Sequence, residues 1–106
     1  MPTYNKLIRD NIPDILENKN LNYKLTTLNE KDYLDAIKSK FKEELDEFFN
    51  SKSISNSLEE LADILELIHA YAIFHNFTFE KIEKIRQKKL LDKGGFSKKL
   101  FLIDTS

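Results

Sequence analysis

The chain has 106 residues, about the length of one domain, and we expect a single domain over residues 1–106. It contains no cysteine, which excludes disulfides and thiolate metal sites, and its net charge of −1 argues against a nucleic-acid-binding protein. Charged residues make up 33% of the chain, which has only two glycines and two prolines, and this balance predicts an all-α fold.

The distribution of apolar residues indicates neither a membrane span nor a signal peptide. No apolar run approaches the roughly 20 residues that a membrane span needs. The first residues, Met1 to Tyr4, lack the basic-then-apolar pattern of a signal peptide. We therefore expect a cytoplasmic protein that binds no membrane and no nucleic acid. A chain of this length builds a thin core, so association with a copy of itself would bury more surface.

The first half of the chain predicts two helices. One is expected over residues 13–19, because Pro13 suits the first turn of a helix. Apolar and polar residues alternate weakly over residues 23–27, which is typical of an extended segment. A long helix over residues 30–50 should follow, with Asn29 as its N-cap.

A polar, serine-rich stretch over residues 51–57 predicts a loop before the third helix. Ser57 and Glu60 have the spacing of a capping box, which predicts that this helix covers residues 58–75. Asn76 suits the position after its C-cap, where the backbone often turns left-handed.

The fourth helix is expected over residues 79–92, with Thr78 as its cap and Gly94-Gly95 ending it. A short apolar segment over residues 100–103 follows, and we interpret it as a tail or a strand. The sequence shows no internal repeat, and no linker separates these elements. The short connections between the helices predict an antiparallel helical bundle.

On a helical wheel of the second helix, one acidic residue lies beside the apolar face, where a charged side chain is unexpected. Within residues 34–49, Glu44 lies on the edge of the apolar arc, whereas Glu43 and Asp46 face solvent. Glu47 lies about 60° further round than Glu44. A lone buried carboxylate costs free energy unless it is paired or bound to a metal.

The third helix is apolar on two sides. One face consists of Leu58, Leu61, Leu65, Ile68 and Ala72. Glu60 and Asp63 begin a second stripe, which continues with apolar and aromatic residues. A helix that is apolar on two sides packs against two neighbours, and in so short a chain we expect one of them to be another subunit. This predicts a homodimer or homotetramer.

The two acidic pairs, Glu44/Glu47 and Glu60/Asp63, each have i, i+3 spacing, so both members of a pair lie on one side of a helix. Antiparallel neighbouring helices would bring the four carboxylates together, where they would repel one another. Mg²⁺ removes such repulsion, because it binds through oxygen and keeps waters for a substrate phosphate. The alternative is that the four are ordinary solvated residues of acidic helices.

The same four residues carry a resemblance to a known family. Glu44-Leu-Asp-Glu47 followed by Glu60-Leu-Ala-Asp63 resembles the ExxE…ExxD signature of the all-α NTP pyrophosphatases. That superfamily includes MazG, the dimeric dUTPases and phosphoribosyl-ATP pyrophosphohydrolase. The resemblance implies that the four acids are the metal ligands and that the metal is Mg²⁺, with Mn²⁺ as a substitute.

Three further segments resemble a small MazG-like subfamily that is described as phosphoribosyl-ATP pyrophosphohydrolase-like. They are residues 4–13, 59–66 and 93–96. The resemblance implies hydrolysis of a nucleoside triphosphate, or a related nucleotide such as phosphoribosyl-ATP, to the monophosphate and pyrophosphate. It also implies a MazG-like bundle whose core is completed by oligomerisation. The base and sugar of the substrate stay open.

Residue roles follow from this resemblance. A metal-bound water would attack the α-phosphorus, and one of the four carboxylates, for which Glu47 is our candidate, would accept its proton. A site that binds phosphate also uses cationic hydrogen-bond donors, and glycine allows the backbone to approach the phosphate closely. The candidates are Lys6, Arg9, Lys88, Lys89, Lys93 and Gly95. For the lysines of the fourth helix, the alternative is a solvated face that complements the helix dipole.

Two other functions compete with this one. Glu66 and His69 form a Glu-x-x-His pair of the kind that holds di-iron in carboxylate bundles, but His69 points away from the Glu60/Asp63 stripe. His75 falls on the apolar face and is interpreted as a core histidine. The other competitor is a non-catalytic helical dimerisation module, which would need no metal.

Overall fold

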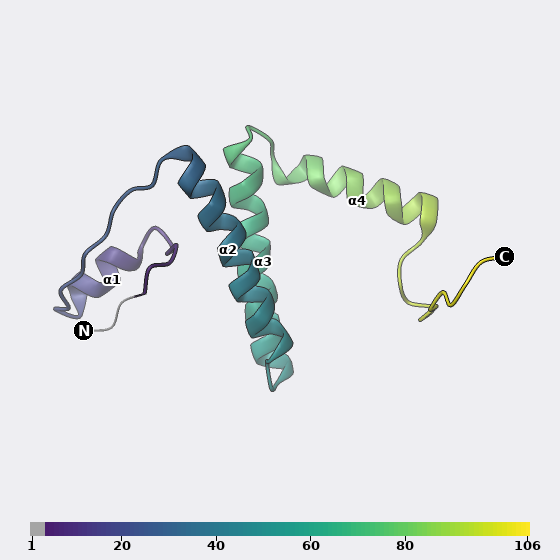
Figure 1. Ribbon diagram of the computed structural model, residues 1–106, viewed down its shortest axis with the longest axis horizontal. Coiled ribbons are helices and arrows are strands. Elements are labelled where there is room, and N and C mark those ends of the chain that lie inside the picture. Colours follow the sequence, from purple (N-terminus) through teal and green to yellow (C-terminus); the bar gives the residue numbers. More distant parts are fainter. Residues whose placement is uncertain (1–3) are drawn as a thin grey trace. The chain divides into compact units, whose positions relative to one another are not determined.

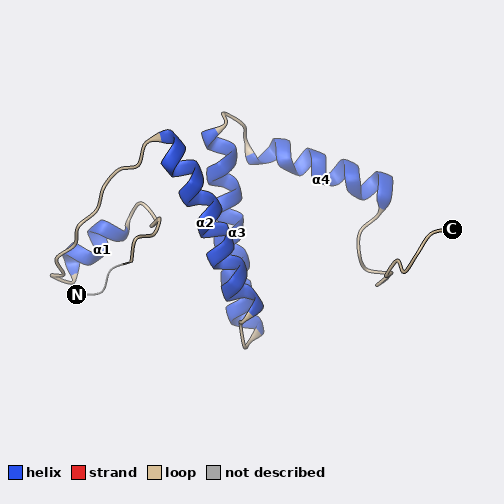
Figure 2. Cartoon of the chain, viewed as in Figure 1, coloured by secondary structure: helices blue, strands red, loops and turns tan. Residues whose placement is uncertain are grey.

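The structure, a computed structural model, describes residues 4–106; residues 1–3, on which part of the signal-peptide expectation falls, lie outside this range (Figure 1). Its elements are α1 (Ile12–Asn18), α2 (Glu30–Phe49), α3 (Ile54–Phe74) and α4 (Phe79–Lys93). No strand occurs in this part of the chain, which confirms the all-α prediction (Figure 2). The segments at 23–27 and 100–103 are neither helix nor strand. None of the described helices is both long and apolar enough to cross a membrane.

Contacts divide the chain into two compact units, residues 1–71 and 72–106, and α3 runs across the boundary between them. The single domain expected over residues 1–106 stays a prediction. The first unit holds α1, α2 and most of α3, and the second holds the end of α3, α4 and the C-terminal segment.

The start of α2 confirms its predicted cap. The Asn29 side chain accepts a hydrogen bond from the Asp32 backbone N–H at 2.8 Å, which satisfies one of the free amides of the first turn. At the other end, Asn50 donates from both its backbone and its side chain to the Asp46 carbonyl. α1, α2 and α4 all begin and end within one residue of the predicted positions.

The start of α3 is where the sequence prediction is wrong. The helix begins at Ile54, one turn before the predicted residue 58, and the Ser53 hydroxyl accepts from the Asn56 backbone N–H at 3.1 Å. The Ser57 hydroxyl instead pairs with the Ser51 hydroxyl at 2.6 Å. Several serines in this stretch can cap a helix, so the spacing alone selected the wrong one.

The end of α3 has the predicted left-handed residue. Asn76 has a φ of +62°, and its N–H donates to the Ile73 carbonyl, while the Phe77 N–H donates to the Ala72 carbonyl at 2.8 Å. These two bonds form a Schellman motif, which satisfies the last carbonyls of the helix. His75 is exposed, against the prediction of a core histidine, because the helix ends at Phe74 and His75 leaves its apolar face.

Glycine ends α4 as predicted. Gly94 has a φ of +83°, and its N–H donates to the Leu90 carbonyl at 2.9 Å. A residue with a side chain is strained at this φ, so the glycine is needed for the turn that follows the helix. Thr78 occupies the N-cap position, although its side chain makes no capping hydrogen bond.

Within the first unit, α2 and α3 lie side by side and antiparallel, joined by residues 50–53 (Figure 1). Ile37 on α2 and Leu67 on α3 are buried. Leu67 belongs to the same stripe as Glu60 and Asp63, so the acidic stripe of α3 faces α2. The N-terminal part of the other apolar face of α3 is open to solvent, with exposed fractions of 61% for Leu58, 44% for Leu61 and 45% for Leu65, whereas Ala72 at its other end is buried.

Candidate metal centre

The four acids selected from the sequence lie together between α2 and α3. Oxygen atoms of Glu44, Glu60 and Asp63 lie within 4.8 Å of one another. Oxygen atoms of Glu44 and Glu47 form a second such group, with Glu43 as its third member. Glu44 belongs to both groups, so it is the centre of the cluster. Because α2 and α3 are antiparallel, the pair Glu44/Glu47 lies beside the pair Glu60/Asp63, as their spacing predicted.

Glu44 is buried, with an exposed fraction of 5%. Its Oε2 atom has no hydrogen-bond partner among residues 4–106, and the same holds for the buried Oε2 of Glu60. Burial, the largest cause, and the neighbouring carboxyls of Glu60, Glu47 and Asp63 together raise the pKa of Glu44 to about 7. Two unpaired carboxylate oxygens in such a place are ready to accept a cation.

The pKa of Glu60 is also raised. Its contact with Glu44 lowers this pKa, but burial and the charges of Glu47 and Asp63 raise it by more. The charges of Glu47 and Asp63 thus make it harder for both Glu44 and Glu60 to ionise. The cluster is electrostatically strained at neutral pH unless positive charge enters it.

Glu43 does not face solvent as the helical wheel predicted. It is half-buried, and its Oε1 accepts from the Lys40 ammonium at 3.4 Å and lies 4.0 Å from the Lys6 Nζ. The wheel describes one helix alone, whereas the N-terminal segment crosses this part of α2 and brings Lys6 to it. Asp46, on the same helix, is exposed as expected.

Two of the predicted phosphate-binding residues reach the edge of the cluster. The Arg9 guanidinium donates to Asp63 Oδ1 at 2.6 Å, and Lys6 approaches Glu43. Both come from the segment before α1, so residues far apart in the sequence meet here. The positive charges of Arg9 and Lys6 partly neutralise the negative charge of the carboxylates and so reduce the repulsion among them.

Lys40 is a site residue that the sequence analysis missed. Its ammonium lies 3.7 Å from Glu44 Oε1, in addition to its bond to Glu43, and its side chain is only 19% exposed. Spacing could have identified it, because Glu43 and Glu44 follow it by three and four residues on one helix.

The remaining phosphate candidates belong to the second unit. Lys88, Lys89 and Lys93 lie on α4 and are exposed, and Gly95 follows the helix. Gly94, rather than Gly95, has the positive φ that only glycine adopts readily. A role for these four residues in phosphate binding stays a prediction.

The two acidic groups among the described residues do not include Glu66 or His69, the pair on which the di-iron alternative depends. Both groups consist of carboxylates alone, and oxygen-only donors are the choice of hard divalent cations such as Mg²⁺ and Mn²⁺. The buried oxygens of Glu44 and Glu60 that lack partners fit such an ion.

Comparisons with family models, with curated proteins and with solved structures find no match to this chain. The resemblance to the all-α NTP pyrophosphatases therefore rests on the sequence motifs alone. What the geometry adds is independent of that resemblance: a half-buried cluster of carboxylates on two antiparallel helices, with three cationic side chains around it.

Proposed function

We propose that the chain is a Mg²⁺-dependent nucleotide pyrophosphohydrolase of the MazG-like type. It would split a nucleoside triphosphate, or a related nucleotide such as phosphoribosyl-ATP, into the monophosphate and pyrophosphate. The main support is Glu44, a buried carboxylate with an unpartnered oxygen, within 4.8 Å of Glu60 and Asp63. A buried carboxylate in that setting needs a cation, and the donor set suits Mg²⁺.

Each residue has a role in this proposal. Glu44, Glu47, Glu60 and Asp63 would hold the metal, which would supply charge neutralisation at phosphate and a water of lowered pKa. Glu47 is exposed at the rim, where a solvent-derived nucleophile can reach it, and we assign it as the acceptor of the nucleophilic water's proton. In the proposed hydrolysis, the oxygen of a water would join the α-phosphorus while the bond from the α-phosphorus to the bridging oxygen breaks, so pyrophosphate would be the leaving group.

Hydrolysis of a nucleotide panel tests this function. Purified protein with Mg²⁺ is incubated with each ribo- and deoxyribonucleoside triphosphate and with phosphoribosyl-ATP, and both pyrophosphate and monophosphate are measured. We expect at least one substrate to give the two products in equal amounts, and EDTA to stop the reaction. Release of orthophosphate instead, or no turnover of any substrate, would contradict the proposal. An absence of turnover would favour the non-catalytic dimerisation module.

We also propose that the protein is a homodimer or homotetramer, assembled through the open face of α3. Support comes from the exposure of Ile54, Leu58, Leu61 and Leu65 on that face, in a chain whose described part buries few large apolar side chains. Contiguous apolar surface of this kind marks an interaction site. Changing one face residue, Leu61→Glu, should dissociate the assembly, because a charge would be buried in the contact.

Light scattering of the parent and of Leu61→Glu at micromolar concentration measures this assembly. The parent should have at least twice the mass of the chain, and the variant the mass of one chain. Glu60 and Asp63 lie on the other stripe of α3, which faces α2, so the substitution should leave the metal cluster intact. A parent that is monomeric throughout the concentration range would refute the proposed assembly.

A further inference from the structure

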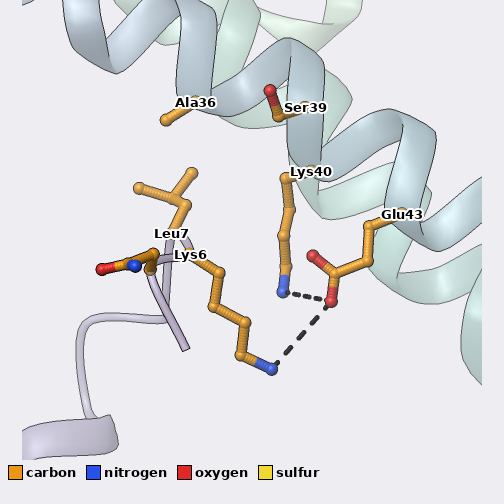
Figure 3. Close-up of a pocket in the computed structure, with 7 residues that line it drawn as sticks. Lys6, Leu7, Ala36, Ser39, Lys40 and Glu43 are labelled. Carbon is orange, nitrogen blue, oxygen red and sulfur yellow. Dashed lines mark hydrogen bonds and ion pairs between the residues drawn. The ribbon is translucent and has the colours of Figure 1, made fainter. Parts of the chain in front are cut away.

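A pocket of about 180 Å³ lies beside the acid cluster, where the N-terminal segment crosses α2 (Figure 3). Leu7 and Ala36 line its apolar part, and Lys6, Ser39 and Lys40 bring hydrogen-bond donors to it. Glu43 lies between the two ammonium groups, and the dashed lines in Figure 3 mark its contacts with both. The pocket thus has a cationic lining next to a strongly acidic cluster.

Lys40 differs from an ordinary surface lysine in its surroundings. Lys40 is mostly buried, and its ammonium lies between Glu43 at 3.4 Å and Glu44 at 3.7 Å. It therefore belongs to the pocket and to the acid cluster at once. Lys6 is more exposed and reaches the same carboxylate, Glu43, from the N-terminal segment. An anion in the pocket would meet both ammonium groups.

The Glu43 carboxylate occupies the place that such an anion would take. It is half-buried, and the longer of its two lysine contacts is 4.0 Å, beyond normal hydrogen-bond distance. A phosphate carries more charge and more acceptor oxygens than a carboxylate, so it can replace Glu43 as the partner of the lysines.

We propose that Lys6 and Lys40 form an anion subsite for the pyrophosphate part of the substrate. This inference rests on the proposed function and deepens it, because it assigns the leaving group to one side of the metal cluster. With the α-phosphate held at the carboxylates, the β- and γ-phosphates extend past Glu44 into the pocket. The lysines bind the charge that develops on the leaving pyrophosphate.

Calorimetric titration with inorganic pyrophosphate in saturating Mg²⁺ tests the subsite directly. Lys6→Gln and Lys40→Gln should each weaken pyrophosphate binding about tenfold or more, because each removes a charge-assisted contact. Lys38→Gln, an exposed position on the same helix, is the matched control and should change binding less than twofold. Lys40→Arg keeps the charge and should restore most of the affinity.

A purely structural role for Lys40 predicts a different pattern. If it only neutralises Glu43 and Glu44, then Lys40→Gln changes the Mg²⁺ affinity and the melting temperature, while pyrophosphate binding at saturating Mg²⁺ stays at the parental value. That result, or an absence of pyrophosphate binding by the parent, would overturn the subsite.

The binding experiment can distinguish failure of the pyrophosphate subsite from failure of the proposed hydrolase function. If no nucleotide is hydrolysed but the two lysine variants lose pyrophosphate, the subsite stands and the hydrolase proposal falls. If a nucleotide is hydrolysed and both variants bind pyrophosphate like the parent, the subsite falls and the hydrolase proposal stands.

Discussion

Replacing Glu44 by glutamine is expected to lower kcat for pyrophosphate release at least ~100-fold, since even changes next to metal ligands cost about 10–100-fold. The substitution keeps the shape of the side chain and removes its charge. Glu44 is the member that both acidic groups share, so its loss affects every way in which the cluster can hold a metal. The measurement is pyrophosphate release at saturating Mg²⁺.

The matched control is Glu59→Gln. Glu59 is the same residue type, is exposed, and lies next to Glu60 on α3. We expect its substitution to leave kcat within a few fold and the free energy of unfolding within about 0.5 kcal/mol. The neighbouring Glu43, which the helical wheel placed toward solvent, is unsuitable as a control because it contacts Lys40 within the cluster. Equal kcat for the Glu44 and Glu59 variants would refute Glu44 as a ligand.

The second large effect concerns stability. Mg²⁺ at about 100 times its dissociation constant should stabilise the fold by about 2.7 kcal/mol. For a domain of this size, that corresponds to a rise of roughly 10 °C in Tm. The physical reason is the repulsion among the carboxylates, which a bound cation removes. Calorimetric melting in EDTA and in Mg²⁺ measures the shift.

The pH dependence of this stability has a definite sign. Folding raises the pKa of Glu44 from 4.5 to about 7. Its contribution to stability is therefore fully present below pH 4.5 and is lost as the pH rises through about 7. Metal-free protein should melt at a lower temperature at pH 8 than at pH 6, and the gain from Mg²⁺ should be larger at pH 8, where the ligand carboxyl is ionised.

Glu44→Gln provides the internal control for that behaviour. Without metal, it should be at least as stable as the parent at pH 8, because one member of a repelling cluster is gone. Its melting temperature should also change less between pH 6 and pH 8. A parent that melts alike with and without Mg²⁺ at pH 8 would rule out the metal centre.

Local chemistry explains which parts of the fold the sequence could predict. Asn29 and Asn76 act on backbone groups within a few residues, so their type and position were sufficient to place the start of α2 and the end of α3. The start of α3 was misplaced because Ser53 and Ser57 offer the same hydroxyl chemistry four residues apart. The convergence of the four acids follows from i, i+3 spacing and an antiparallel turn.

The rest of the site depends on contacts between distant residues. Arg9 meets Asp63, and Lys6 meets Glu43, only because the N-terminal segment folds back over the helices. No pattern within a single helix indicates this, which is why Glu43 was wrongly placed toward solvent. Lys40 is different, since its helical spacing was available in the sequence and was not used.

The short connection between α2 and α3 has a consequence for how the centre is assembled. The four acids fall within residues 44–63, and only residues 50–53 separate the two helices that carry them. Bringing the acids together therefore requires only the closure of a short loop, which costs little conformational entropy. Contacts between residues that are close in the sequence also favour rapid folding. The carboxylates consequently meet as soon as the helical hairpin forms, and their repulsion opposes that early step. In the metal centre that we propose, a divalent cation present during folding would relieve this repulsion and accelerate the step.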